Sequence, residues 1–254
     1  MTGWKGQVVW ITGASSGIGR ALAVRLAGEG AWVFASARNA AALAELQAAH
    51  GIEPVPCDVT DRAAVLAAAA RIGERAGRLD VLVANAGTCE YLDVQAFDSA
   101  LVERVFAANL FGAVYTLEAA LPLLRAGRTR YIVGVGSTAA WTGLPRAEAY
   151  GASKAALHYF LESLRVDLTP EHFAVSVVAP GFVETPLTDR NDFPMPMRIS
   201  VERAVDYIVD GMAARDHEIH FPPAFSRTLK ALRLLPSRWR NALYQRMLRE
   251  EQGP

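Results

Sequence analysis

An apolar run over residues 8–11 ends in the glycine-rich sequence Thr12-Gly13-Ala14-Ser15-Ser16-Gly17-Ile18-Gly19, after which the periodicity becomes helical. Glycine permits a tight turn at such a junction and lets backbone N–H groups approach a phosphate at the positive end of the following helix. Glycines also form turns and helix caps that bind nothing. Because this junction follows the first apolar strand of the chain, it favours dinucleotide binding and an α/β fold.

Six further apolar runs follow, each separated from the one before by a segment of helical periodicity. The seven predicted strands are residues 8–11, 31–36, 51–57, 79–84, 130–136, 174–179 and 218–221. Each is a continuous apolar run, as expected when helices cover both faces of a sheet. The alternation predicts an α/β protein with a Rossmann-type, doubly wound parallel seven-stranded sheet and helices on both faces.

The predicted helices are residues 17–28, 39–49, 61–75, 99–124, 150–168 and 201–214. Thr60 and Ser200 are the expected N-caps of the third and the last of them. Neither a fixed-period repeat nor a Ser-, Gly- or Pro-rich linker divides the chain. We therefore expect one dinucleotide-binding and catalytic domain over residues 1–223, followed by a basic amphipathic extension over residues 224–254.

The composition excludes several classes of protein. The 254-residue chain carries 26 Lys+Arg and 26 Asp+Glu, and this balance argues against a nucleic-acid-binding protein. Cys57 and Cys89 are too few for a disulfide framework and show no metal-ligand spacing. The N-terminus lacks the pattern of a signal peptide, and no run of about 18 apolar residues is present to span a membrane. We expect a cytoplasmic protein with no metal site.

The pattern Thr-Gly-x-x-x-Gly-x-Gly at residues 12–19 resembles that of the short-chain dehydrogenase/reductase family. The resemblance extends over residues 6–222 and includes, in the right order, Asp58, the turn Asn85-Ala86-Gly87, and Asn109 in the long fourth helix. It implies that Asp58 contacts adenine, that the turn shapes the adenine side of the cleft, and that Asn109 belongs to the catalytic site. Taken singly, each of these residues fits an ordinary turn or helix. Ala84 departs from the family, which often has a second asparagine there.

The end of the second strand bears on the choice of cofactor. A carboxylate at this place accepts hydrogen bonds from the ribose 2′-hydroxyl of NAD, whereas a 2′-phosphate needs a cation. Here Ala37 stands where NAD-preferring members of the family keep an aspartate, and Arg38 follows it. A guanidinium can hold a phosphate through two hydrogen bonds. The sequence therefore predicts NADP(H) in preference to NAD(H), although Arg38 could also be an exposed loop residue.

Tyr150 and Lys154 are four residues apart, on one face of a predicted helix. A tyrosine ordinarily has a pKa near ~10, too high for a base at neutral pH, and a neighbouring cation would lower it. We therefore expect Tyr150 to act as general acid and base with Lys154 beside it. Lysine can also hold the nicotinamide ribose.

Ser137 directly follows the fifth strand and matches the catalytic serine of the family. The resemblance implies that Ser137 hydrogen-bonds the substrate oxygen, while Asn109 supports a water that links Lys154 to solvent. Asn109, Ser137, Tyr150 and Lys154 are thus the four expected catalytic residues. As structural residues, Ser137 would be a helix cap and Tyr150 a buried aromatic.

A Pro-Gly turn follows the sixth strand, and by the same resemblance Val183 and Thr185 bind the nicotinamide carboxamide there. The full set of expected cofactor-binding residues is Gly13, Ser15, Ser16, Gly17, Ile18, Gly19, Arg38, Asp58, Val59, Asn85, Ala86, Gly87, Tyr150, Lys154, Pro180, Gly181, Val183 and Thr185.

Three segments are expected to wall the substrate pocket: residues 88–92, 138–149 and 187–199. Their larger side chains are Tyr91, Trp141, Leu144, Leu187, Phe193, Met195 and Met197. Such a lining suits an apolar carbonyl compound or secondary alcohol.

The extension carries seven Lys or Arg and two Glu, for a net charge of +5, and its apolar residues fall at roughly helical spacing, broken by Pro236. A basic amphipathic helix of this kind either docks on an acidic surface of its own or a partner subunit, which we favour, or makes peripheral contact with a membrane.

The resemblance implies an NADP(H)-dependent oxidoreductase acting on a small carbonyl compound or alcohol, assembled as a homodimer or homotetramer through the helices at 99–124 and 150–168. An epimerase or dehydratase that keeps the cofactor without net redox would need a larger C-terminal substrate domain. A cofactor-binding sensor or regulatory protein on the same fold would be expected to have lost catalytic residues, and all four are present.

Overall fold

The computed structural model describes residues 3–191 and 193–251, and it contains the predicted seven-stranded parallel sheet, in the order β3-β2-β1-β4-β5-β6-β7. The strands are β1 (Val8–Thr12), β2 (Trp32–Ser36), β3 (Glu53–Pro54), β4 (Val81–Ala84), β5 (Tyr131–Val135), β6 (Ala174–Pro180) and β7 (Glu218–Phe221). The strand order reverses between β1 and β4, and a crevice at such a point is where open α/β sheets bind their ligands.

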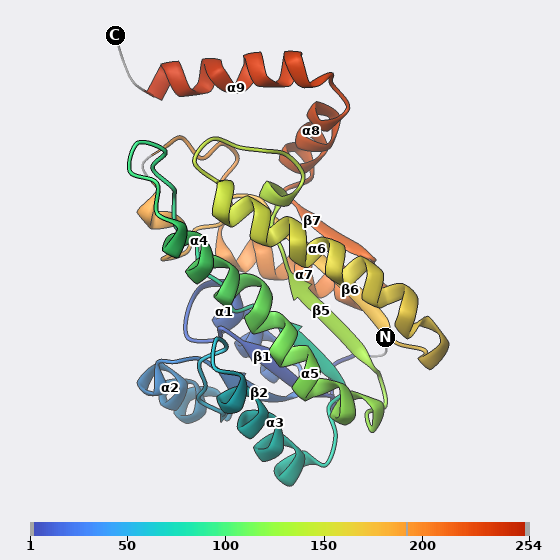
Figure 1. The fold of residues 1–254 in the computed structure, drawn as a ribbon. Helices are drawn as coiled ribbons and strands as arrows, with labels where there is room; N and C mark the ends of the chain where they lie inside the picture. Colours follow the sequence, from blue (N-terminus) through green and yellow to red (C-terminus); the bar gives the residue numbers. More distant parts are fainter. Residues whose placement is uncertain (1–2, 192, 252–254) are drawn as a thin grey trace.

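Helices cover both faces of the sheet, so the predicted fold class is confirmed (Figure 1). They are α1 (Gly17–Gly28), α2 (Ala40–His50), α3 (Arg62–Ala76), α4 (Ser99–Phe106), α5 (Gly112–Arg125), α6 (Glu148–Leu168), α7 (Val201–Ala214), α8 (Pro223–Arg233) and α9 (Ser237–Glu251). Val9 and Ile11 of β1 pack on the face covered by α1, α2 and α7. Val8 and Trp10 pack on the face covered by α3, α5 and α6. Because β1 is buried on both faces, its residues 8–11 are all apolar.

Strand β3 is shorter than the seven residues predicted. Only Glu53 and Pro54 pair with β2, and β3 is the edge of the sheet. Proline lacks the N–H that a ladder hydrogen bond needs, so Pro54 and Pro56 limit the pairing.

The long helix predicted over 99–124 is divided into α4 and α5 by a π-helical segment, Ala107–Phe111, and Asn109 lies within it. Such wide turns often occur at functional sites. By length and hydropathy the continuous stretch Ser99–Arg125 could cross a membrane, but 44% of its most apolar window is buried inside the fold. The buried residues of α5 pack against β4 and α3, which is the position of a core helix.

One of the two predicted helix caps is wrong. The side chain of Asp61, not Thr60, accepts hydrogen bonds from the N–H groups of Ala63 and Ala64 at the start of α3. An aspartate one residue later offers the stronger acceptor. Ser200 caps α7 as predicted, accepting from the N–H of Arg203.

The C-terminal extension forms α8 and α9, with Pro236 between them, and α9 lies at the end of the molecule farthest from β2 and α3 (Figure 1). Leu229 of α8 is buried against Trp141 and Ala179. The Tyr244 hydroxyl of α9 lies 2.7 Å from the Thr142 hydroxyl. The ammonium of Lys230 pairs with the carboxylate of Glu218 on β7. The extension therefore docks on its own chain, whereas the division of domains at residue 223 stays a prediction.

Candidate active site

The loops that follow β1, β4, β5 and β6 meet at the carboxyl edge of the sheet, and they bring the predicted motifs together. The glycine turn contacts the Asn85-Ala86-Gly87 turn directly. A Cβ added to Gly13, whose φ is +68°, would lie 2.7 Å from the Cα of Ala86, and one added to Gly19 would lie 2.4 Å from Nδ2 of Asn85. The two turns approach so closely because these positions have no side chain.

Asn85 and Thr12 fasten these turns to each other. Nδ2 of Asn85 donates to the carbonyl oxygens of Thr12 at 2.9 Å and Gly13 at 3.2 Å. The Thr12 hydroxyl oxygen accepts from the backbone N–H groups of Asn85 and Ala86. Sequence reasoning placed Asn85 here but gave Thr12 no role. The signal in the sequence that could have identified Thr12 is its position as the first residue of the Thr-Gly motif.

The N-terminus of α1 is open toward the crevice. Ser16 is its N-cap residue, extended in backbone, and its side chain makes no capping hydrogen bond. No acidic residue lies in the first turn. The first N–H groups of a helix have no partner within the helix and carry a partial positive charge, so they suit a phosphate. Gly17, with φ +54°, lies against Thr185, since an added Cβ would be 3.1 Å from its Cγ2. Ser15 and Ile18 flank these positions, half-buried.

Asn109 joins the turn after β4 to α6. Its Oδ1 accepts from the N–H of Thr88 at 2.7 Å, and its Nδ2 donates to the Thr88 carbonyl and to the Ser153 hydroxyl, both at 2.9 Å. The side chain is fully buried. These bonds fix the distance between the turn and the residue next to Lys154. The predicted support of a water by Asn109 stays a prediction.

Lys154 is buried at the centre of the motifs. Its Nζ donates to the carbonyl oxygen of Val135, the last residue of β5, at 2.8 Å. A Cβ added to Gly87 would lie 3.2 Å from this Nζ. Burial, which disfavours the charged form, lowers the pKa of Lys154 to about 8. The ammonium form still predominates at pH 7.

Tyr150 and Ser137 lie next to each other, but the predicted electrostatics of Tyr150 are wrong. Burial raises the pKa of the Tyr150 phenol to about 12, and a hydrogen bond with the Ser137 side chain opposes this rise only in part. Nζ of Lys154 is 6.0 Å from the centroid of the Tyr150 ring. Desolvation is thus the largest cause of the shift, and the expected lowering of the pKa by Lys154 does not occur. At neutral pH the Tyr150 hydroxyl is protonated and suited to donating a proton.

His158, one helical turn beyond Lys154, is a residue that sequence reasoning missed. Its Nε2 accepts from the backbone N–H of Ser137 at 3.3 Å. Burial lowers the pKa of the imidazole to about 4, so it is neutral at pH 7 and can accept this bond. A Cβ on Gly136 would lie 1.9 Å from Nε2. Only glycine at 136 leaves room for the ring, and that pairing was not readable from the sequence.

The Pro-Gly turn after β6 faces the glycine turn. The carbonyl oxygen of Pro180 accepts from the Thr138 hydroxyl at 3.1 Å, and the N–H of Gly181 donates to Phe221 at 2.7 Å. Val183 is buried, and its N–H has no acceptor among residues 3–191 and 193–251. The Thr185 hydroxyl lies 3.2 Å from the Thr188 hydroxyl. The turn therefore presents the N–H of Val183 and the hydroxyl of Thr185 beside the N-terminus of α1.

The side chains expected at the adenine end are less enclosed. Arg38 is exposed, and it makes no hydrogen bond or ion pair within the described part of the chain. Asp58 is half-buried, and its Oδ1 accepts from the N–H and the hydroxyl of Thr60 at 2.9 and 2.8 Å. Val59 packs against Gly112 of α5. Asp58 thus has a structural role in the turn before α3, and its outer oxygen remains available to a ligand.

Two of the three predicted pocket walls come together. The Tyr91 hydroxyl donates to Oδ1 of Asn191 at 2.7 Å, and its ring meets that of Phe193 edge to face at 5.5 Å. Phe193 also contacts Phe182, with ring centroids 6.1 Å apart. Cys89 is half-buried beside this cluster, and burial raises the pKa of its thiol. Aromatic and apolar groups thus line this side of the site.

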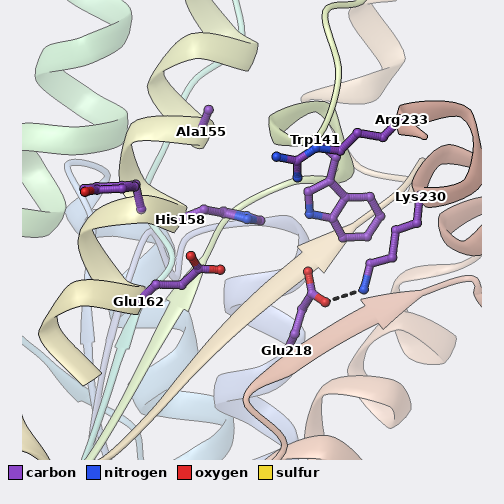
Figure 2. A pocket seen from close by; sticks show the side chains of 8 residues that line it. Trp141, Ala155, His158, Glu162, Glu218, Lys230 and Arg233 are labelled. Carbon is purple, nitrogen blue, oxygen red and sulfur yellow. Dashed lines mark hydrogen bonds and ion pairs between the residues drawn. The ribbon is translucent and has the colours of Figure 1, made fainter. Parts of the chain in front are cut away.

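The prediction that residues 138–149 form the third wall is partly wrong, because Trp141 and Leu144 line other cavities. Trp141 lines a cavity of about 400 Å³ between α6, β7 and α8, together with His158, Glu162, Glu218, Lys230 and Arg233 (Figure 2). Nζ of Lys230 is 4.8 Å from the centroid of the Trp141 ring. Leu144 faces Tyr244 of α9 across a smaller cavity. The extension covers both residues.

A family model described as short chain dehydrogenase matches residues 7–193 of the chain. The chain is 38% identical over 232 residues to an uncharacterized oxidoreductase of Myxococcus xanthus, covering 89% of this chain and 92% of that protein. It is 36% identical over 185 residues to the rhamnolipids biosynthesis 3-oxoacyl-acyl-carrier-protein reductase of Pseudomonas aeruginosa, covering 69% of this chain and 72% of that protein.

Solved structures with the same fold contain either nicotinamide cofactor. A short chain dehydrogenase of Burkholderia cenocepacia in complex with NADP superposes with a TM-score of 0.82 at 29% identity, covering 96% of this chain and 98% of that chain. A short chain dehydrogenase/reductase of Burkholderia phymatum in complex with NAD also gives a TM-score of 0.82, at 25% identity, covering 91% and 94%.

Proposed function

The chain belongs to the short-chain dehydrogenase/reductase family of oxidoreductases, and from this premise we propose that it is an NADP(H)-dependent enzyme that interconverts an apolar carbonyl compound and its alcohol. The observation that carries the proposal is the convergence of Ser137, Tyr150 and Lys154 beside the open N-terminus of α1. The glycine turn after β1 leaves room for a dinucleotide, and the N–H of Val183, which has no acceptor in the described residues, can donate to it. A merely structural cluster would not need both an open helix terminus and a protonated phenol.

In the direction of reduction, Tyr150 donates its phenolic proton to the carbonyl oxygen, and Ser137 hydrogen-bonds the same oxygen. The high pKa of Tyr150 keeps this proton in place at neutral pH. The ammonium of Lys154 lies near enough to stabilise the negative charge left on the phenol oxygen. When bound, the nicotinamide supplies the hydride. The bonds of Asn109 and His158 hold α6 and the backbone of Ser137 in position for this transfer.

The choice of NADP(H) rests on Arg38. Its exposed guanidinium has no acidic partner in the described residues and stands at the end of β2, where the ribose of a dinucleotide lies in this fold class. Neighbouring Ala37 brings no negative charge that would repel a 2′-phosphate. These features support NADP(H) over NAD(H).

Arg38→Asp is expected to lower kcat/KM for NADPH by about 100-fold, since it removes a charge-assisted hydrogen bond and adds a repulsive carboxylate. The same variant should raise kcat/KM for NADH. Initial rates with both cofactors measure this, and Arg71→Asp, an exposed arginine of α3, is the matched control. An unchanged kcat/KM for NADPH in Arg38→Asp would show that Arg38 does not bind the cofactor.

The substrate class rests on the apolar side of the site. Tyr91, Phe182 and Phe193 form a connected aromatic cluster, which favours a hydrophobic carbonyl compound over a sugar phosphate. The similarity to a 3-oxoacyl-acyl-carrier-protein reductase supports the same class.

The direct test follows NADPH and NADH oxidation with a panel of hydrophobic aldehydes, ketones and 3-oxoacyl thioesters. Consumption of NADPH with formation of the matching alcohol is the expected result. Tight NADPH binding without turnover of any member would instead favour a cofactor-binding sensor. Isomerised or dehydrated product without net NADPH oxidation would favour an epimerase or dehydratase.

We also propose a cytoplasmic homo-oligomer. Both cysteines are free, as in reducing compartments. On the helices expected to form the interface, Phe111, Tyr159 and Val166 are 49%, 75% and 71% exposed. Large apolar side chains at such exposure are typical of a surface that a second subunit covers.

A further inference from the structure

The C-terminal extension leaves one apolar stripe uncovered. It consists of Leu234 and Leu235 in the turn before α9 and of Trp239 and Leu243 on α9, and we call these four residues the outer stripe. They are 86%, 42%, 62% and 38% exposed. Trp239 and Leu243 are four residues apart and share one face of the helix. Leu234 and Trp239 keep most of their surface exposed, whereas more than half of Leu235 and of Leu243 is covered.

The opposite side of α9 is the side that docks. Tyr244 is buried, and its hydroxyl reaches Thr142 at 2.7 Å. At 100° per residue, Tyr244 lies about 140° around the helix from Trp239. Asn241 and Gln245 face residues 143–145 on the same docked side. With α9 held by Tyr244, Trp239 lies on the side of the helix away from this contact.

The extension is mostly basic, and its two acids, Glu250 and Glu251, come at the end of α9. Residues 222–249 contain no Asp or Glu, and they contain Arg227, Lys230, Arg233, Arg238, Arg240, Arg246 and Arg249. Lys230 is the one paired with an acid, Glu218, in the part of the chain that the structure describes. The guanidinium of Arg238 lies 5.9 Å from the ring centroid of Trp239. Apolar groups with a tryptophan, set in a basic segment, match the interface of a bilayer that carries anionic headgroups.

We propose that the C-terminal extension binds the surface of an anionic phospholipid membrane, with the outer stripe inserted at the acyl boundary and the surrounding cations against the headgroups. The alternative occupant is a second copy of the chain. A two-fold contact centred on the outer stripe would bring the cations around the stripe close to those of the second copy, with no acid in residues 222–249 to compensate. The charge therefore favours the membrane. This inference does not depend on the proposed reaction.

The test is co-sedimentation of the full chain with two kinds of vesicle. One is phosphatidylcholine alone, and the other is three parts phosphatidylcholine to one part phosphatidylglycerol. We expect partition into the anionic vesicles to be at least about tenfold stronger and to fall as salt is raised. The double variants Trp239→Ser/Leu243→Ser and Arg238→Gln/Arg240→Gln should each weaken it by about tenfold.

The control variant is Phe97→Ser, which removes a side chain that is 68% exposed outside the extension. It should bind vesicles like the parent. The replaced residues are exposed, except for Arg240, which is half-buried and donates to the carbonyl oxygen of Arg233 at 3.3 Å. An unchanged melting temperature verifies that each variant folds. The proposal is overturned if the parent does not sediment with anionic vesicles, or if both double variants still do so fully. It is equally overturned if the stripe variant changes only the oligomeric state in gel filtration.

Discussion

Tyr150→Phe is expected to lower kcat for carbonyl reduction by about a thousandfold while NADPH still binds. The substitution removes only the hydroxyl, which is the proton donor and the partner of Ser137. General acid catalysis contributes about 10²- to 10⁴-fold. The ring remains, so the packing of α6 is kept and the cost in folding free energy is about 1 kcal/mol.

The measurement is single-turnover and steady-state reduction together with a fluorescence titration of NADPH. Tyr159→Phe is the matched control, because Tyr159 lies on the same helix and is 75% exposed. It should behave like the parent. A Tyr150→Phe enzyme that keeps more than a tenth of the parent kcat would show that another group donates the proton.

Gly19→Ala is expected to weaken NADPH binding by about 100-fold or more and to lower the melting temperature. The new Cβ would lie 2.4 Å from Nδ2 of Asn85 and 2.5 Å from the carbonyl oxygen of Gly13. The second contact is with backbone, so side-chain movement alone cannot relieve it. Displacing Asn85 breaks its bonds to Thr12 and Gly13 and opens the junction of the two turns. Misaligned N–H groups then bind the phosphates poorly.

Gly28→Ala is the control in the same helix. Gly28 is the last residue of α1, and no heavy atom lies within 4 Å of the position that an added Cβ would take. The change should leave NADPH binding unaltered and the stability equal or higher by up to about 1 kcal/mol, because alanine favours a helix. Thermal unfolding and NADPH titration of both variants give the comparison. Equal effects of the two substitutions would contradict the steric argument for Gly19.

Much of the fold was predictable because its signals are local. Apolar runs and helical periodicity gave the seven strands and their order of succession, and the bounds of α1, α7 and β7 agree with the prediction to the residue. The departures have local causes too. Prolines shorten β3, and a π-helical turn carries Asn109 between α4 and α5.

The side-chain contacts of the site were only partly predictable. The motifs identified Asn85, Asn109, Tyr150 and Lys154, but not what each of them touches. Thr12 and Asn85 are 73 positions apart, and Ser137 and His158 are 21 apart. Such pairs arise only when the sheet brings their loops together. Likewise, Trp141 was expected to face the substrate, and the docking of α8 turns it toward Lys230 instead.

The sequence by itself determined the sheet, the glycine turn, the family and the net positive charge of the extension, because each depends on residue types at short spacing. The tertiary structure alone decided the direction of the pKa shifts of Tyr150 and Lys154 and the side of α9 that stays exposed. The physical reason is that desolvation and burial depend on distant elements. The pKa of the phenol rises or falls with what encloses it, and an apolar stripe is a surface only where no other part of the chain covers it.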